Sequence, residues 1–409
     1  MNSYLKKFGF QEPKINSIPN RDLGIVVVIP CHNEPDLIAT LDSLEKCIKP
    51  NCEILILVVV NQSENCNNSI NERNNKTIHE FSDWDKQERV FDYQIIHEDN
   101  LPKKHAGVGL ARKIGMDEAV NLFYLIDTDG IIVALDADCE VETNYFIEIE
   151  NHFIKHPKTP GCSIRYAHPL SGELENEIYS GIIQYELHLR YYNQALRMCE
   201  FPYAFHTVGS SMAVRSSAYQ KQGGMNKRKA GEDFYFLQKI IELGGFTELN
   251  STCVIPSPRI SDRVPFGTGK AIGDFISNNS NEIFTYQFDS FLGLMEINKN
   301  LINFYEGNKY DINFVGLIDF LPTIDFENKL EEIRNNTTNY PNFKKRFFTF
   351  FNAFTVLKYM HFVRDNKLSN KPIEKESIKL LKRVYGIDNE FESRKEILET
   401  YRKIEANIS

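Results

Sequence analysis

The chain has 409 residues, of which 42% are hydrophobic and 25% are charged, a composition typical of a soluble globular protein. Its length suits one large domain with an additional region. The net charge of −9 argues against a nucleic-acid-binding protein, because such proteins normally present a basic face.

The sequence shows no feature of export or membrane insertion. The first eleven residues (MNSYLKKFGFQ) lack the apolar core of a signal peptide, and no apolar stretch reaches the roughly 18 to 20 residues that span a bilayer. The eight cysteines are scattered without the spacing of a zinc site, so we expect reduced and mostly buried thiols. These features favour a cytoplasmic protein.

Strand and helix patterns alternate through the first third of the chain. Apolar, β-branched runs predict strands over 25–29, 53–60, 91–97 and 131–135, the first of them ending at Pro30. Helical spacing covers 36–47 and 107–123, and the polar, Asn-rich stretch 64–89 is expected to be a surface excursion.

This alternation predicts an α/β fold with a mostly parallel sheet flanked by helices. Such a sheet binds its ligand at the carboxyl ends of the strands. Pro30, Asn61, Asn100 and Asp136 all fall at predicted strand ends, so we expect a ligand site there.

The pattern changes after about residue 145. The stretch 173–198 is aromatic and amphipathic, 207–214 is expected to be a strand, and 229–244 contains an acidic pair that opens a helix. From residue 271 onward the sequence is helical and rich in aromatic residues. We therefore expect a catalytic domain over 1–270 and a helical C-terminal region over 271–409 that packs on it.

The aromatic run 346–363 (RFFTFFNAFTVLKYMHFV) is too short for a membrane-spanning helix and contains a lysine and a histidine. We expect it to form core of the helical region. Peripheral contact with a membrane surface is the alternative.

Two carboxylates, Asp136 and Asp138, lie one residue apart at the tip of the predicted fourth strand. Their mutual repulsion is relieved most simply by a divalent cation with oxygen ligands, such as one that also holds nucleotide phosphates. A solvated turn is the alternative interpretation of an isolated D-x-D pattern.

Taken together, several segments resemble family 2 glycosyltransferases, which have the GT-A fold. The resemblance covers roughly residues 22–270 and depends on segments that occur in the order of that family. These are VVVIPCHNE (26–34), ILVVVNQS (56–63), GVGLARKIGMDEA (107–119), VALDADC (133–139), VGSSMAVR (208–215) and GGM…GEDFYFLQK (223–239). The resemblance implies transfer of a hexose-type sugar from a nucleotide-sugar donor, such as a UDP- or GDP-sugar, with Mg²⁺ or Mn²⁺ and with inversion.

The resemblance also implies roles for individual residues. Asp138 would bind the metal, and Asp136 would contact the donor ribose or the metal's water shell. The expected donor-binding residues are Pro30, His32, Asn33, Glu34, Asn61, Gly107, Arg112, Asp136, Ala137 and Arg263. An acid at the start of a helix that complements the helix dipole is the alternative interpretation of Glu34.

Two of these positions need comment. The family usually has an Asp where this chain has Asn61, and an amide can still bond a nucleobase edge, although the choice of base becomes open. Gly107 begins a helix with Lys103, Lys104, Arg112 and Lys113 around it, which suits a diphosphate. A solvated basic face is the alternative, and the missing third glycine argues against a dinucleotide-binding motif.

By resemblance, Asp233 is the general base that deprotonates the acceptor hydroxyl, and Glu232 shapes the pocket. Acids in the first turn of a helix are otherwise common as caps. Arg259 and Arg263 are expected to clamp phosphate oxygens. A third metal ligand is not identified, with Asp262, His168 and His206 as candidates.

Two other functions remain as alternatives. A sugar nucleotidyltransferase would need a glycine-rich loop after the first strand, where this chain has Pro30 to Glu34 and no glycine. A non-catalytic nucleotide-sugar-binding relative is expected to lose one acidic pair, and both pairs are present. The acceptor stays open among glycans, lipid-linked sugars and small molecules, and the aromatic stretch 179–192 is as well explained by core packing as by glycan binding.

Overall fold

The computed structural model describes residues 2–261, 263, 267–278 and 280–407. Contacts within the chain divide it into two compact units, each built from separate stretches of sequence. Unit 1 comprises Met1–Gly172, Thr207–Lys270 and Glu405–Ser409. Unit 2 comprises Glu173–His206 and Ala271–Ile404.

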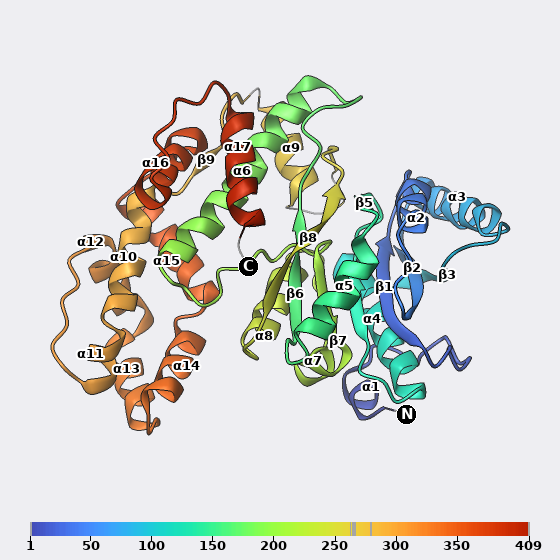
Figure 1. Cartoon of the computed structure of the whole chain (residues 1–409), viewed down its shortest axis with the longest axis horizontal. Coiled ribbons are helices and arrows are strands. Elements are labelled where there is room, and N and C mark those ends of the chain that lie inside the picture. Colours follow the sequence, from blue (N-terminus) through green and yellow to red (C-terminus); the bar gives the residue numbers. More distant parts are fainter. Residues whose placement is uncertain (1, 262, 264–266, 279, 408–409) are drawn as a thin grey trace. The chain divides into compact units, whose positions relative to one another are not determined.

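Unit 1 is organised around a sheet whose eight strands, in the part of the chain that the structure describes, have the order β3-β2-β1-β4-β7-β6-β8-β5 (Figure 1). The strands are β1 (Leu23–Cys31), β2 (Glu53–Ser63), β3 (Asp92–Leu101), β4 (Ile131–Ala134), β5 (Cys139–Val141), β6 (Gly161–Tyr166), β7 (Met212–Arg215) and β8 (Thr247–Pro256).

Four of the strand pairs are parallel and three are antiparallel. β3, β2, β1 and β4 run parallel to one another, and β6 runs parallel to β8. β7 and β5 run in the opposite direction. The central strands β1 and β2 are almost wholly buried, as expected for the continuous apolar runs that parallel sheets need on both faces.

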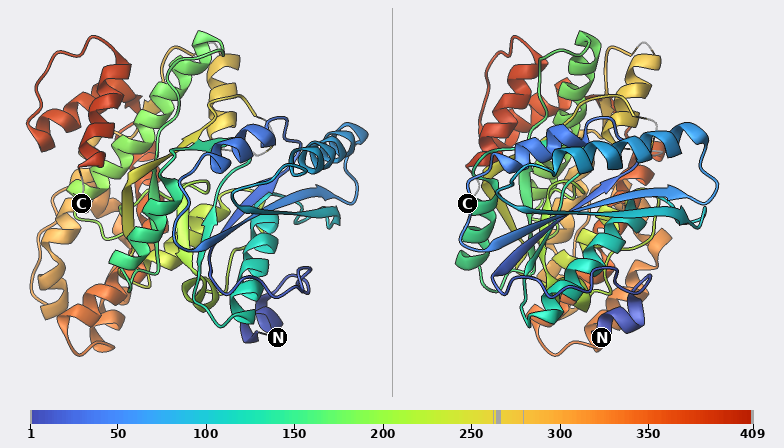
Figure 2. Two further views of the ribbon diagram at one scale, coloured as in Figure 1. Left: turned by 45° about the vertical axis from the view of Figure 1, so that its right-hand side comes forward. Right: turned by 90° about the vertical axis from the view of Figure 1, so that its right-hand side faces the viewer.

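Helices cover both faces of the parallel part of this sheet. Figure 2 shows α2 and α3 on one side of β1 to β3, and α4 on the other. The helices of unit 1 are α1 (Ser3–Phe8), α2 (Leu37–Glu45), α3 (Asn68–Trp84), α4 (Val108–Leu125), α5 (Tyr145–Lys155), α7 (Ser216–Lys221) and α8 (Glu232–Ile241). The α/β class with a mostly parallel, helix-flanked sheet is confirmed.

Three local predictions differ from the structure. β1 continues through Pro30 to Cys31, because an adjacent parallel strand still aligns with it there. The stretch 64–89 is not only a surface excursion, since it contains the 17-residue helix α3. The strand predicted over 207–214 is confined to β7.

Unit 2 is helical, which confirms the helical character predicted for the C-terminal region, and it also includes the long helix α6 (Asn176–Met198). α6 packs against α10 and α16. The other elements are β9 (Phe284–Thr285), α10 (Phe288–Lys299), α11 (Leu301–Glu306), α12 (Val315–Phe320), the 3-10 helix η1 (Leu321–Ile324), α13 (Phe326–Asn335), α14 (Tyr340–Phe350), α15 (Ala353–Asn366), β10 (Lys371–Pro372), α16 (Ile373–Tyr385) and α17 (Arg394–Ala406). α9 (Thr268–Ser277) crosses from the stretch assigned to unit 1 into that of unit 2.

The aromatic run forms two helices rather than one. Asn352 separates α14 from α15 because its side chain accepts hydrogen bonds from the backbone N–H groups of Phe354 and Thr355, at 3.1 and 3.2 Å. Phe343, Phe347 and Phe351 stack along α14 and are buried, so the run forms core in unit 2.

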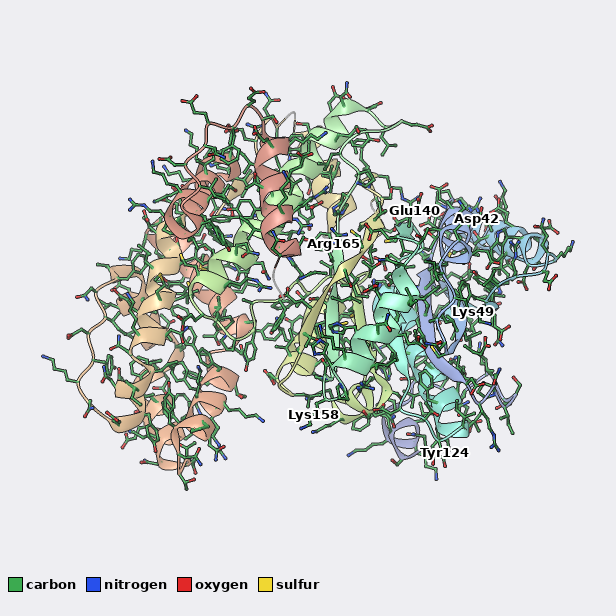
Figure 3. All side chains as sticks on the ribbon, viewed as in Figure 1. Asp42, Lys49, Tyr124, Glu140, Lys158 and Arg165 are labelled. Atoms are coloured by element: carbon green, nitrogen blue, oxygen red, sulfur yellow. The ribbon has the colours of Figure 1, made fainter. Side chains whose placement is uncertain are left out.

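The cysteines agree with the expectation of reduced and mostly buried thiols. All eight cysteine thiols are free, and six of them are buried among the side chains that fill each unit (Figure 3). Within the described residues, every helix is either too short or too polar to cross a membrane.

Candidate functional site

Two charged clusters lie at the carboxyl ends of the parallel strands, and the strand-tip carboxylates Asp136 and Asp138 belong to one cluster each. We call the first the arginine cluster; it consists of Glu34, Asp138, Arg259 and Arg263. The second, the acidic cluster, consists of Arg112, Asp136, Glu232 and Asp233. All eight side chains come from unit 1.

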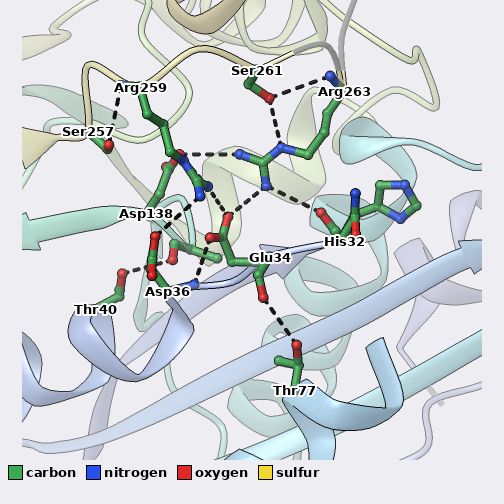
Figure 4. A network of polar contacts seen from close by, with 12 residues as sticks. His32, Glu34, Asp36, Thr40, Thr77, Asp138, Ser257, Arg259, Ser261 and Arg263 are labelled. Atoms are coloured by element: carbon green, nitrogen blue, oxygen red, sulfur yellow. Dashed lines mark hydrogen bonds and ion pairs between the residues drawn. The ribbon is translucent and has the colours of Figure 1, made fainter. Parts of the chain in front are cut away.

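The arginine cluster joins the loop after β1, the tip of β4 and the segment after β8 (Figure 4). Both guanidinium groups bridge the same two carboxylates. Arg263 lies 2.6 Å from Glu34 Oε2 and 3.3 Å from Asp138 Oδ2. Arg259 lies 3.0 Å from Asp138 Oδ2, and it also contacts Glu34.

Glu34 is held by its backbone as well as by its side chain. Its side chain is 1% exposed, and its Oε1 accepts a hydrogen bond from the backbone N–H of Asp36 at 3.0 Å. Its carbonyl oxygen accepts from Arg73 and Thr77 of α3, at 3.0 and 3.2 Å. Because Asp36 directly precedes α2, this hydrogen bond also fits an acid that complements the helix dipole, and that alternative for Glu34 stays open.

The two guanidinium groups do not fully balance the carboxylates. Burial raises the pKa of the Asp138 carboxyl, the charge of Asp136 raises it further, and Arg259 and Arg263 lower it only in part. Burial and the neighbouring carboxylates therefore favour the uncharged form of Asp138, and positive charge beside it favours the charged form.

In the acidic cluster, one buried guanidinium group joins two elements. The Arg112 side chain is 3% exposed and forms ion pairs with Asp136 at the end of β4 and with Glu232 at the start of α8. These charges raise the pKa of Arg112 despite its burial. Because the guanidinium group already has two carboxylate partners, Arg112 links the strand tip to α8.

Asp233 is the second residue of α8 and is oriented by two backbone donors. Its Oδ2 accepts from Gly209 N at 3.0 Å, and its Oδ1 accepts from Phe234 N at 2.7 Å. Burial raises the pKa of Asp233, which makes its carboxylate a stronger base. Each oxygen keeps a further lone pair for another donor.

Gly209 comes very close to Arg112. A Cβ atom at Gly209 would lie 2.5 Å from Nη1 of that arginine, so only glycine lets this loop cross the guanidinium group and still reach Asp233. The VGSSMAVR segment contains this glycine, although its pattern indicated only a strand.

The glycines that open α4 serve close packing. A Cβ atom at Gly109 would overlap the carbonyl oxygen of Arg228 and lie 3.0 Å from the Cβ of Glu232. Gly107 packs against Lys229 in the same way, at 3.1 Å. Lys113 is buried with Asp117, at 3.0 Å, rather than exposed beside a diphosphate. The glycines thus bring the start of α4 against the loop that leads to Glu232.

Hydrogen bonds connect residues after the end of β1 to the end of β2 and to α3. The His32 Nδ1 lies 2.7 Å from the carbonyl oxygen of Asn61, so this nitrogen carries the proton that it donates. Asn33 has a left-handed φ of 50° and donates its backbone N–H to Asn74 at 2.9 Å. The buried Oδ1 of Asn61 has no hydrogen-bond partner among the described residues.

Two further predicted residues, Pro30 and Ala137, contribute to the same edge of the sheet through their backbone. Pro30 aligns with Val59 inside the sheet, and the carbonyl of Ala137 accepts from Thr40 at 2.9 Å. Asp262 lies outside the described residues. Within those residues, no group of three or more His, Cys, Asp or Glu side chains is arranged to hold a metal ion.

Sequence reasoning missed the contribution of α3 to the site. Arg73 and Thr77 are spaced i, i+4 and so share one face of that helix, but both lie in a stretch rich in Asn whose composition predicts a surface excursion. Gly209 and Asn226 were also not assigned, although Asn226 donates to the carbonyl of Glu232 at 3.0 Å.

Comparison with protein-family models finds no match, and neither does comparison with curated proteins. Among solved structures, the chain is similar to S. aureus TarS 1–349 in complex with UDP-GlcNAc, with 12% identity, a TM-score of 0.42, and coverage of 94% of this chain and 90% of that chain. For S. aureus TarS 1–349 in complex with UDP, the identity is 11% and the TM-score is 0.41, over 76% of this chain and 82% of that chain. The fold class follows from the strand order given above.

Proposed function

We propose that the chain is a glycosyltransferase that moves a sugar from a nucleotide-sugar donor, such as a UDP- or GDP-sugar, to an acceptor hydroxyl with inversion. The observation that carries this proposal is the division of the two strand-tip carboxylates between two clusters. One cluster offers paired guanidinium groups for an anion, and the other places a carboxylate with raised basicity nearby in the same unit.

The arginine cluster supplies groups suited to the donor's diphosphate. Arg259 and Arg263 present several N–H donors each, and guanidinium groups bind phosphate oxygens in a bidentate manner. Their side chains are 18% and 27% exposed, so a ligand can reach them. In this proposal the guanidinium groups exchange part of their carboxylate contacts for phosphate contacts when the donor binds.

The residues present fit a Mg²⁺ or Mn²⁺ ion. Mg²⁺ is commonly bound by one or two carboxylates together with waters and substrate phosphates, and Asp138 with Asp136 would provide those carboxylates. A cation there would stabilise the charged form of Asp138, whose pKa is raised by burial and by the charge of Asp136. Such an ion would neutralise charge that develops on the departing nucleoside diphosphate.

Asp233 is the proposed general base. Its two backbone hydrogen bonds fix its orientation, and its raised pKa keeps it basic enough to accept the proton of an acceptor hydroxyl. Arg112 and Glu232 hold the adjacent backbone of α8 against the strand tip. The acceptor then loses its proton to Asp233 as its oxygen attacks the anomeric carbon and the bond to the nucleoside diphosphate breaks.

A donor panel with Mn²⁺ tests the function. We expect slow release of nucleoside diphosphate from one nucleotide sugar, and faster release when an acceptor is added. Asp233→Asn keeps the size of the side chain and can keep one of its two backbone hydrogen bonds, because an amide has a single acceptor oxygen. The amide accepts no proton, so transfer should fall by about 10² to 10⁴ with donor affinity retained.

Two results would contradict the proposal. If no nucleotide sugar binds or is cleaved, the chain is not this kind of transferase. If Asp233→Asn transfers sugar at the wild-type rate, Asp233 is a helix-terminal acid without a chemical role. Glu242→Gln is a matched control, because Glu242 is an acid just after the other end of α8.

A further inference from the structure

The N-terminal segment of the chain contains a buried tyrosine whose hydroxyl is hydrogen-bonded to side chains of α4. Tyr4, on α1, is 5% exposed, and its hydroxyl donates to Asp117 Oδ1 at 2.9 Å. The same hydroxyl accepts from Lys113 Nζ at 3.1 Å. Tyr219 of α7 also donates to Asp117 Oδ1, at 2.8 Å, so the Tyr4 side chain connects α1, α4 and α7.

More of this segment is tied to α4 and β3. The backbone N–H of Lys14 donates to Glu118 of α4, at 2.5 Å, and Asn121 of α4 donates to the carbonyl of Ile15 at 3.1 Å. The Lys14 ammonium group lies 2.8 Å from Glu98 of β3. We call residues 2–15 the N-terminal arm. Its contacts are specific and partly buried, which distinguishes it from an ordinary loose terminus.

Of the elements that the arm joins, α4 carries Arg112 of the acidic cluster, and α7 precedes the loop that leads to Glu232 and Asp233. Arg112 precedes Lys113 on α4, so one turn of this helix faces both the cluster and the arm. α7 leads through Gly223 and Gly224 into the loop before Glu232, and both glycines have left-handed φ values, of 78° and 75°. Any side chain at Gly224 would overlap the Tyr4 hydroxyl, so this turn is fitted to the arm.

The loop between α7 and α8 contacts both the start of α4 and Glu232. Its residues 226–229 pack on Gly107 and Gly109 at the start of α4, and Asn226 donates to the carbonyl of Glu232. Tyr4 thus fixes α7 and its turn at one end of the loop, while the α4 glycines fix the other end. Glu232 and Asp233 follow immediately.

We propose that the N-terminal arm positions the residues of the acidic cluster, and that it does so through the hydrogen bonds of the Tyr4 hydroxyl. By holding α4 and α7 together, Tyr4 sets the distance between Arg112 on one element and the loop that delivers Glu232 and Asp233 on the other. The effect of Tyr4 on catalysis rests on the proposed glycosyltransferase function. The effect of Tyr4 on the stability of the loop is independent of that function.

Hydrogen exchange of the full chain tests the coupling directly. Tyr4→Phe removes the hydroxyl and keeps the ring, and we expect amides in residues 225–234 to exchange about tenfold faster, because the loop opens locally more often. Tyr124→Phe is the matched control, since Tyr124 is half exposed near the far end of α4 (Figure 3). It should leave exchange unchanged.

A transfer assay adds the functional measurement. We expect kcat of Tyr4→Phe to fall about tenfold while KM for the donor stays within about twofold, because the arginine cluster is not touched. Faster exchange that is confined to residues 2–15, or that rises equally in β1 and β2, would overturn the inference. If wild-type protein transfers no sugar, the proposed function fails, and the exchange result alone decides the role of the arm.

Discussion

Asp136 and Asp138 have different electrostatic surroundings although one residue separates them. Asp136 faces the buried Arg112, which it shares with Glu232, so its partner cannot leave without stranding a buried charge. Asp138 faces Arg259 and Arg263, whose side chains are partly exposed and can move toward a ligand. β4 ends at Ala134, so Asp136 and Asp138 lie in the turn that follows it, and this turn separates a fixed carboxylate from an exchangeable one.

The exchangeable carboxylate gives the first prediction. Asp138→Ala should abolish Mn²⁺-dependent binding of nucleoside diphosphate while leaving the protein folded, because Asp138 is the proposed metal ligand and its arginine partners are partly exposed. Calorimetric titration with and without Mn²⁺ measures this. Asp36→Ala is the control, since Asp36 is exposed and contacts Arg259 only at 3.4 Å. Unchanged metal-dependent affinity in folded Asp138→Ala would rule out the assignment.

His152 gives a pH prediction that does not involve the site. Burial, together with the charges of His156 and Lys155, lowers the pKa of His152 to about 4. Between about pH 6.5 and pH 4 the unfolded chain binds a proton that the native chain does not, so the free energy of unfolding falls as the pH falls. Above pH 6.5 this contribution is constant.

Urea unfolding at several pH values measures the effect. His152→Gln should flatten the acid slope by up to about 1.4 kcal/mol per pH unit. His188, whose pKa burial also lowers to about 4, should leave a residual slope. The exposed His79 provides the control variant His79→Gln, with the wild-type slope expected. A wild-type slope in His152→Gln would show that His152 is protonated in the native protein.

At the scale of elements, the start of α4 depends on the absence of side chains. Gly109→Ala should lower the free energy of unfolding by about 1 to 3 kcal/mol, because the new methyl group overlaps the backbone of the loop before Glu232. This cost opposes the roughly 1 kcal/mol that alanine gains over glycine in a helix.

Gly107→Ala is the matched comparison. Its Cβ would lie 3.1 Å from Lys229, a contact that small shifts can relieve, and its extended backbone is open to any residue. We expect a clearly smaller loss in the same unfolding measurement. Equal stability of the two variants would mean that the loop is not pressed against α4.

The elements that sequence predicted well are those whose apolar pattern is continuous. β1, β2 and β4 are buried on both faces, so their runs of Val, Ile and Leu were sufficient to locate them and the carboxylates beyond them. α3 was missed because Asn and other polar residues fill most of its surface, and its N-terminus is set by a side-chain cap from Asn67 at 2.9 Å.

The contacts within the site could be predicted only in part. The motifs located Glu34, Asp138 and Arg263 separately, and the strand-end rule brought them to one edge of the sheet. The sequence could not show that Arg112 joins Asp136 to Glu232, because this pairing depends on how closely Gly109 and Gly209 let backbone segments approach. Such distances follow from packing across elements, which hydrophobic periodicity does not encode.

At the scale of the whole molecule, each unit is assembled from distant parts of the sequence. α6 precedes β7 of unit 1 in the chain but belongs to unit 2, where Leu187 and Tyr191 are fully buried. In the same unit, Glu186 of α6 is buried and pairs with Arg402 of α17 at 2.7 Å. α6 therefore depends on helices that the chain supplies more than a hundred residues later.

This dependence predicts the result of truncation. A chain that ends at Gly269 keeps α6 but lacks α10, α16 and α17, so Leu187 and Tyr191 lose their covering helices and Glu186 loses an ionic partner. We expect it to aggregate and to elute in the void volume on size-exclusion chromatography. A second variant, in which a Gly/Ser linker also replaces residues 173–206, should be more soluble because the exposed helix is gone. A soluble, monomeric chain of residues 1–269 that cleaves donor at the full rate would show instead that α6 is stable without its partners.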